Sequence, residues 1–464
     1  MTKQRASLSR PQARAGPVSR RAMFAGVALL GAAALSGCAS SQLKETAQRI
    51  DVMAAELEAP PPDPPEDGAA LGPADLLAHA NARGKDFMRA RIARARAVLD
   101  LNKVKSARYP RVSAEARQIS TFTGDFEAPE SVSNIVLGVN WDISRALLRL
   151  DRKTVKVAGR LIPVQYQVAQ RNATRELIDT YNDYTALEFQ RESVSLKRKG
   201  LQCRVDDKEV EVALGNASAL ELETLKDEID AARREAMAVS RSLASKRDEL
   251  LGLSGLAEGG YAVAPGRSLT DALEDYPSVT SEDADACFAR SGKKRLEDLL
   301  VEAAAAQLAI ARQSRFTRLT TSIPSFMTQT GGFNLQFLIS YVLPIIDEGD
   351  ALRLTQQARL TLLDTILTAR DNRRAFMSDF DSLKLGIAGA ESELAAASSV
   401  LARSRTLLES ADPTERCAAA NDVEKARADV RAARYKIERL KADLRLLCAP
   451  PAERRDDVTE ATGE

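Results

Sequence analysis

The chain is poor in the residues on which most enzymes and nucleic-acid-binding proteins depend. Its 464 residues include one histidine, His79, seven methionines and 5% aromatic residues, and the net charge is +1. It has no Cys-x-x-Cys pair, phosphate-binding glycine loop or nucleophile elbow, and no cluster of soft ligands for copper or silver. We therefore expect no enzyme, no metal site and no cofactor. Without an excess of positive charge, nucleic acid is not expected as a partner.

The N-terminus has the features of an export signal. A basic flank that includes Arg10, Arg14, Arg20 and Arg21 precedes an apolar stretch at 22–36, which is too short to cross a bilayer as a helix. The stretch ends in Leu-Ser-Gly-Cys at 35–38, which resembles the bacterial lipobox. We therefore expect Cys38 to carry lipid and to anchor the mature chain to outer-membrane lipid. An ordinary signal beside a chance cysteine is the alternative, and the Ser-Arg-Arg at 19–21 leaves twin-arginine export open.

Four further cysteines follow in the rest of the chain. They are Cys203, Cys287, Cys417 and Cys448. In an oxidising compartment this even number permits two disulfides, and three pairings are possible.

Most of the chain after the signal has the composition and periodicity of long helices. We expect helices over 40–59, 75–107, 144–212, 219–251, 295–315, 348–408 and 417–447. A proline-rich spacer at 60–65 follows the first of them, and Pro163 is expected to bend or break the third. Gly215 is expected to adopt a positive φ in a turn, and Ser218 to cap the helix after it.

Alternating residues between the helices predict strands. In 135–143 and 333–343 every second residue is large and apolar, and most of the others are small or polar. Weaker candidates at 111–122 and 319–329 would complete two β-hairpins, the second turning at Gly331-Gly332. Helix, hairpin, long helix, tip and return helix thus occur twice, which indicates an internal repeat.

The two different strand faces fit an outer-membrane β-barrel, with the apolar face toward lipid and the polar face toward a lumen. Four strands cannot span a membrane alone, because their open edges would leave backbone groups unpaired in lipid. The smallest closed barrels need about eight strands, so copies of the chain would have to share one barrel. A half-buried sheet packed on a helix in a soluble protein is the alternative.

These segments together resemble the TolC-like outer-membrane efflux proteins, also called outer-membrane factors, many of which are lipoproteins. The segment 342–349 is similar to that family's strand-to-helix junction, and 214–222 is similar to its first periplasmic tip, with Glu221 where an aspartate is usual. The chain departs from the family at 141–144, which lacks the Pro and Gly of the first junction. It departs again at 411–416, which lacks the Gly-x-x-Ser pattern of the second tip.

The resemblance implies a mostly α-helical fold with a small β part, assembled as a homotrimer with a twelve-stranded β-barrel on a periplasmic α-barrel. It divides the chain into the following parts. They are a signal peptide at 1–37, a lipidated linker at 38–72, a first repeat at 73–252 with its hairpin at 111–143, an equatorial linker at 253–292, a second repeat at 293–449 with its hairpin at 319–343, and a disordered tail at 450–464.

The implied function is that of the outer-membrane channel in a tripartite efflux or type I secretion system. Its partners would be a periplasmic adaptor and an inner-membrane pump or ABC exporter, and its cargo is not indicated. The alternative, a periplasmic coiled-coil structural lipoprotein, leaves the alternating strands unexplained.

The resemblance also implies roles for particular residues. Gly215 and Ser218 would dock the adaptor, unless they only form the turn. The tips near 203–220 and 405–420 would open and close. Near the first tip, acidic residues would form rings toward the lumen, unless they are simply solvated; they are Asp206, Asp207, Glu209 and Glu211. Cys287 would pair with Cys448 in an equatorial layer outside the long helices.

Overall fold

A computed structural model describes the following residues: 41–58, 70–106, 111–121, 130–142, 150–256, 260–274, 276, 283–313, 318–327, 333–335, 338–342, 350–412 and 416–450. The signal segment with Cys38, the spacer at 60–65, the turn at 331–332 and the tail from 451 lie outside these ranges. Contacts divide the chain into two units, 1–51 and 52–464. The described part of the first unit belongs to α2 (Ser41–Glu58), the helix expected over 40–59. The following paragraphs concern the second unit.

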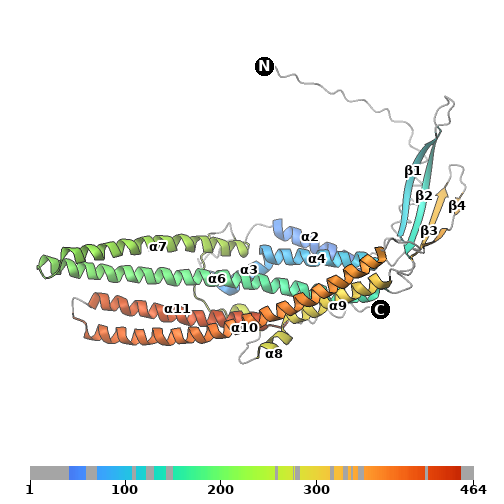
Figure 1. Cartoon of the computed structure of the whole chain (residues 1–464). Helices are drawn as coiled ribbons and strands as arrows, with labels where there is room; N and C mark the ends of the chain where they lie inside the picture. The colour runs from blue at the N-terminus through green and yellow to red at the C-terminus, as the bar shows by residue number, and fades with distance from the viewer. Residues whose placement is uncertain are drawn as a thin grey trace, which may run out of the picture. The chain divides into compact units, whose positions relative to one another are not determined.

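Two long helical hairpins make up most of the second unit (Figure 1). The first consists of α6 (Leu150–Ala213) and α7 (Ala219–Leu253), and the second of α10 (Asp350–Ser410) and α11 (Arg416–Cys448). Helix α6 contacts both α7 and α11, while α10 contacts α11. The four helices therefore form a layer in the order α7, α6, α11, α10.

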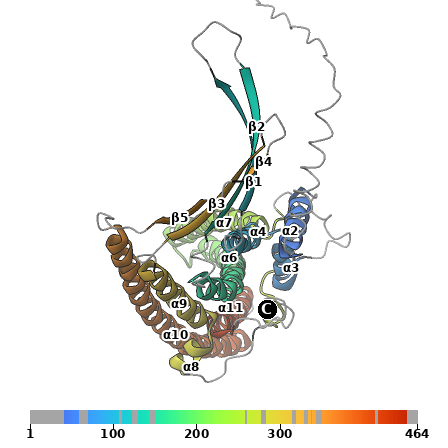
Figure 2. The same cartoon turned by 90° about the vertical axis from the view of Figure 1, so that its right-hand side faces the viewer.

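Shorter helices pack against one end of this layer. Helices α3 (Pro73–Arg83) and α4 (Lys85–Ser106) contact α6, and α9 (Gly292–Gln313) contacts both α6 and α10 (Figure 2). The expected linker contains a short 3-10 helix η1 (Asp271–Leu273) and α8 (Ala284–Arg290). Among the described residues, no helix combines the length and the apolar composition needed to cross a bilayer.

Of the bend or break expected at Pro163, the break is wrong, because α6 continues through this residue. Proline removes one backbone N–H from the helix and crowds the carbonyl four residues earlier, which belongs here to Gly159. Its neighbours Ile162 and Val164 are buried. This packing on both sides of the proline favours the continuous helix despite the lost hydrogen bond.

The single helix expected over 75–107 is divided at Gly84 into α3 and α4. A Cβ atom at position 84 would lie 2.6 Å from the carbonyl oxygens of both Ala80 and Leu253. Only glycine allows this close approach of the α7 end to the α3–α4 junction. The break therefore results from a tertiary contact that the helical pattern of the segment does not reveal.

The strands form one antiparallel sheet in the order β1, β2, β3, with β4 and β5 both pairing with β3. Their bounds are β1 Arg111–Thr121, β2 Glu130–Asp142, β3 Arg318–Met327, β4 Phe333–Leu335 and β5 Leu338–Val342. The register places Ala116 opposite Ile135 and Leu137 opposite Ser325. Strand β2 starts five residues before the predicted 135. The predicted strand 333–343 is observed as β4 and β5, which pair with β3 in one register, with Leu335 opposite Ser325 and Leu338 opposite Ser322. Residues 336–337 and 343 lie outside the described residues.

The largest apolar core lies where α3, α6, α7, α11 and the segment 261–273 meet. It includes Leu76, Tyr181, Leu250, Leu273 and Leu446, each at most 2% exposed. The segment 261–273 is also held to α6 by hydrogen bonds, because the Tyr181 hydroxyl donates to the carbonyl of Ala264 at 2.7 Å and accepts from the N–H of Arg267 at 3.1 Å. This core fixes the position from which the long hairpins extend.

Candidate functional site: the helical tips and the α6–α11 seam

The turn between α6 and α7 is the first tip of the helical layer. Gly215 has a φ of 78°, and the Ser218 hydroxyl accepts a hydrogen bond from the N–H of Leu220 at 3.2 Å. Both conformational predictions for these residues are therefore confirmed. Leu214 and Leu220 flank the turn and are about 70% exposed. The tip thus presents two leucine side chains beside a backbone turn that needs glycine.

Acidic residues before the turn differ in their partners. Glu209 pairs with Lys226 at 2.8 Å, and Glu211 pairs with Lys208 at 2.6 Å. Asp206 accepts a hydrogen bond from the Gln202 amide at 2.9 Å, and Asp207 is half-buried. Within the described residues neither aspartate has an ion-pair partner, which distinguishes these two residues from Glu209 and Glu211.

A disulfide joins the two hairpins close to the tips. It links Cys203 of α6 to Cys417 of α11, and their Cα atoms are 5.9 Å apart. The sequence allowed three pairings and did not select this one, because the choice depends on α6 and α11 being neighbours. The residues 413–415 of the second tip lie outside the described ranges.

The second disulfide joins Cys287 of α8 to Cys448, the pair that the resemblance implies, with their Cα atoms 4.9 Å apart. Both residues are at most 1% exposed and pack with Phe288 and Phe376, whose rings meet edge to face at 5.1 Å between centroids. The expectation that both cysteines lie outside the long helices is wrong for Cys448, which is the last residue of α11.

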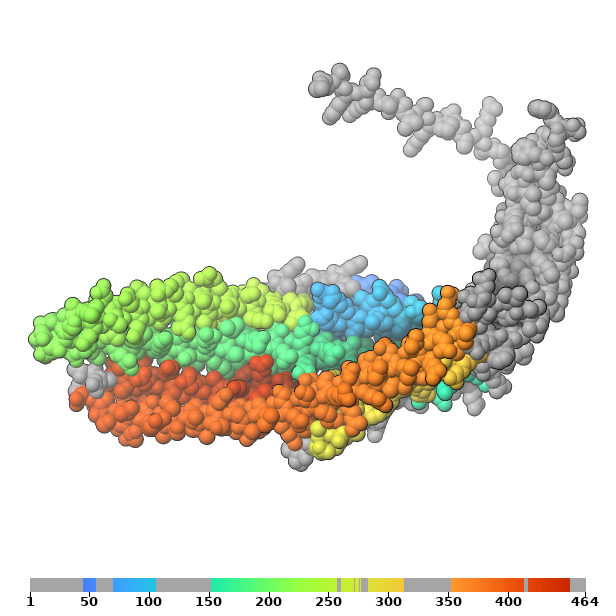
Figure 3. Space-filling model, in the orientation of Figure 1, coloured from blue at the N-terminus to red at the C-terminus, as the bar shows by residue number. Residues whose placement is uncertain are grey.

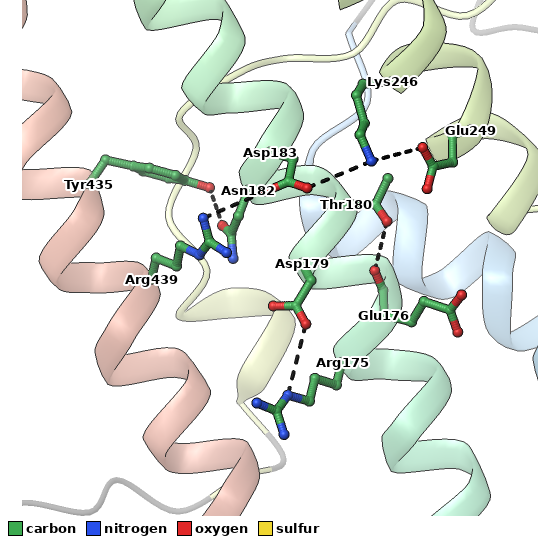
Figure 4. A network of polar contacts seen from close by, with 10 residues as sticks. All are labelled: Arg175, Glu176, Asp179, Thr180, Asn182, Asp183, Lys246, Glu249, Tyr435 and Arg439. Carbon is green, nitrogen blue, oxygen red and sulfur yellow. Dashed lines mark hydrogen bonds and ion pairs between the residues drawn. The ribbon is translucent and has the colours of Figure 1, made fainter. Parts of the chain in front are cut away.

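Polar contacts connect α6 to both of its neighbours near the middle of the layer (Figure 4). The Asp183 carboxylate lies 3.7 Å from Lys246 of α7 and 3.7 Å from Arg439 of α11. One residue earlier, Asn182 accepts a hydrogen bond from the Tyr435 hydroxyl of α11 at 2.7 Å. The α6–α11 seam, defined here as the contact of α6 residues 171–205 with α11, therefore contains buried polar groups.

Two carboxyl groups in this seam, those of Asp179 and Asp443, influence each other electrostatically. Asp443 is 7% exposed, and its Oδ1 atom has no hydrogen-bond partner among the described residues. Burial and the charge of Asp179 raise the pKa of Asp443 to about 6, while Arg439 and Arg175 act in the opposite direction. Burial also raises the pKa of Asp179. This pair could not be predicted from the sequence, because aspartates are common on exposed faces of polar helices.

Among the described residues, no group of three or more His, Cys, Asp or Glu side chains is arranged to hold a metal ion. The features above are turns, covalent links and charges along helix surfaces. They are suited to contacts between proteins and to movement of helices.

No protein-family model matches the sequence, and no curated protein matches it significantly. Solved structures do match. The outer membrane protein VceC of Vibrio cholerae has a TM-score of 0.60 and 13% identity, over 81% of this chain and 96% of VceC. CusC, whose structures concern transmembrane channel formation, has a TM-score of 0.62 and 14% identity, over 85% of this chain and 99% of CusC. The MtrE outer membrane channel of Neisseria gonorrhoeae has a TM-score of 0.59 and 16% identity, over 81% of this chain and 89% of MtrE. The chain has the fold of TolC-like outer-membrane channel proteins.

Proposed function

We propose that the protein is the outer-membrane channel component of a tripartite efflux or type I secretion system. In this role three copies form a conduit across the periplasm and the outer membrane. The observation that carries the proposal is the extent of the fold likeness, which covers 85% of this chain and 99% of CusC.

The sheet supports the sharing of a barrel between copies. Within the described residues, β1 pairs only with β2, and β4 and β5 pair only with β3. Both sides of the sheet therefore present an edge. Unpaired edges are unfavourable in lipid, and pairing with further copies of the same chain satisfies them.

The helical layer supports the same assembly, because both of its outer helices expose apolar side chains. On α10 these are Leu352, Leu354, Leu360, Leu363, Leu367, Leu385, Val400 and Leu407, and on α7 they are Leu220 and Met237. Rows of exposed leucines on one helix mark an interaction surface. Contact between the α10 edge of one copy and the α7 edge of the next uses two different surfaces, and such head-to-tail contacts close into rings.

The remaining parts of the proposal concern the partners and the membrane. The tip at Gly215 and Ser218 docks a periplasmic adaptor, which connects the channel to an inner-membrane pump or ABC exporter. Lipid on Cys38 anchors the N-terminus to the outer membrane.

In this role the protein catalyses no reaction of its own. The division into repeats at 73–252 and 293–449, with a linker at 253–292, belongs to the same proposal.

The test is the size and conductance of the full-length protein purified in detergent. We expect the mass of three copies by native mass spectrometry and discrete conductance steps in planar bilayers. Leu363→Glu combined with Leu367→Glu should reduce the trimer fraction, because it places two charges on the α10 edge. Val52→Glu, at an exposed position on α2 outside the layer, is the matched control and should assemble normally.

A monomer that gives no conductance would overturn the proposal. It would favour the alternative of a periplasmic coiled-coil structural lipoprotein, particularly if the protein without its lipid anchor were soluble without detergent.

A further inference from the structure

The Cys203–Cys417 disulfide lies close to the ends of the helices that it joins. Cys203 is ten residues before the end of α6 at Ala213, and Cys417 is the second residue of α11. Only about 15 Å of α6 extends beyond the link, at about 1.5 Å per residue. In the space-filling view the green α6–α7 hairpin extends beyond the orange and red α10–α11 hairpin at this end (Figure 3).

Noncovalent contacts between the two hairpins are sparse at this level. The apolar cluster nearest the first tip consists of Leu201, Val205, Ile229 and Ala232, which all belong to α6 and α7. On the other hairpin, Val423 is the first buried residue of α11. The first seven residues of α11 therefore add no fully buried side chain to the seam.

Polar contacts add little to the link. Arg204 and Asp422 lie 3.5 Å apart, but their side chains are 53% and 52% exposed, and exposed ion pairs contribute little because water screens them. Asn421 donates from its amide to the carbonyl of Cys417 at 3.0 Å and to Cys203 Sγ at 3.5 Å. These contacts surround the disulfide, which is thus the main connection between the hairpins near the tips.

We propose that the Cys203–Cys417 disulfide makes the two hairpins of one copy move as a single body near the tips. This inference rests on the proposed channel function, and it specifies which helices move when the tips of the channel open. Because α11 cannot swing away from α6, opening within a copy is prevented. The tips then open only by movement between the α7 edge of one copy and the α10 edge of the next.

The test compares two double variants of the full-length protein. Cys203→Ser with Cys417→Ser removes the tip link, and Cys287→Ser with Cys448→Ser is the matched control that removes the other disulfide. We expect the tip variant to increase single-channel conductance or open time about twofold or more. Amide exchange over 416–422 should become about tenfold faster. The control should change neither quantity at the tips.

Mild reduction of the unmodified protein gives a second measurement that needs no substitution. Cys417 is exposed and Cys203 is half-buried, whereas Cys287 and Cys448 are at most 1% exposed. A small reductant should therefore open the tip disulfide first and reproduce the behaviour of the tip variant.

The outcomes separate this inference from the proposed function. If the unmodified protein forms conducting trimers but the tip variant matches it in conductance and exchange, the inference is wrong and the channel function stands. An equal change in both double variants would also overturn it, since the effect would not be specific to the tips. If the unmodified protein neither assembles nor conducts, the channel function fails, and the gate mechanism fails with it.

Discussion

The hydroxyl of Tyr435 donates a hydrogen bond to Oδ1 of Asn182 at 2.7 Å, and this contact joins α11 to α6 inside the seam. Asn182 is fully buried, and Tyr435 also meets Phe189 edge to face at 5.8 Å between ring centroids. Burial raises the pKa of Tyr435, so the phenol remains a neutral donor at physiological pH. The two halves of the chain are thus connected by a specific polar contact as well as by apolar packing.

Replacing Tyr435 by Phe tests this contact. The substitution leaves the buried Asn182 oxygen without its donor, and we expect a loss of about 1–3 kcal/mol in the free energy of unfolding. Thermal unfolding of the purified protein, followed by circular dichroism, measures the change. Tyr166→Phe is the control, because that hydroxyl only accepts a part-buried hydrogen bond from Gln170 on the same helix. Equal stability of both variants would show that the seam contact contributes nothing.

Asp443→Asn tests the buried carboxyl group. A pKa raised from 3.8 to about 6 means that the folded chain holds a proton in this range which the unfolded chain has released. The free energy of unfolding therefore falls as pH rises from about 4 to 6. Above pH 6 the destabilisation caused by the ionised Asp443 is complete. The asparagine variant cannot ionise, so it should be more stable than the parent at pH 7.5, by about 1–3 kcal/mol, and should gain nothing at pH 4.

The measurement for Asp443 is the midpoint of thermal unfolding between pH 4 and pH 8. Asp422→Asn serves as its control, because Asp422 is exposed and paired with Arg204. A parallel pH dependence of the Asp443 variant and the parent would contradict the assignment.

Gly84→Ala should destabilise the junction of α3 and α4. The new Cβ atom would lie 2.6 Å from two carbonyl oxygens that belong to backbone and cannot rotate away, so we expect a loss of about 1–3 kcal/mol. Gly252→Ala, nearby in α7 with no atom within 4 Å of the new Cβ, should be neutral or stabilise by up to about 1 kcal/mol. Thermal unfolding distinguishes the two variants, and a stable Gly84→Ala protein would refute the close approach of Leu253.

Asp206→Asn combined with Asp207→Asn tests the acidic ring. If these aspartates face the lumen, their removal should lower the preference for cations, measured as the reversal potential across a salt gradient in a planar bilayer. Glu209→Gln with Glu211→Gln is the matched control, because both glutamates are already paired with lysines. An unchanged reversal potential for the aspartate variant would show that these residues are only solvated.

Photo-crosslinking tests the docking of an adaptor at the first tip. A photoreactive residue at positions 214, 216 or 220 should give products with a second protein in cells that contain the native system. The same residue at position 240, which is exposed in the middle of α7, should give fewer. No product at any of the three tip positions would count against docking there.

The sequence predicts most of the helix and strand positions, because their periodicities are local. The expected helix over 219–251 is observed as Ala219–Leu253, and the expected strand over 111–122 as Arg111–Thr121. The roles of Gly215 and Ser218 in the turn could also be predicted, since positive φ and helix capping depend on a few consecutive residues.

The sequence does not predict the features that depend on contacts between segments far apart in the chain. The break at Gly84 depends on the carbonyl of Leu253, and the pairing of Cys203 with Cys417 depends on the contact between α6 and α11. Asp443 looks like any other charged residue of a polar helix until its neighbour Asp179 is known. In each case the missing information is which helix lies opposite.

The two disulfides have overlapping spans, from 203 to 417 and from 287 to 448. A single proteolytic cut anywhere between residues 204 and 447 therefore leaves the two fragments covalently attached. This stretch includes the first tip and the segment after α7, where exposed turns are most open to proteases. A chain nicked in this stretch would keep its two fragments together, and the damage would appear only on a reducing gel.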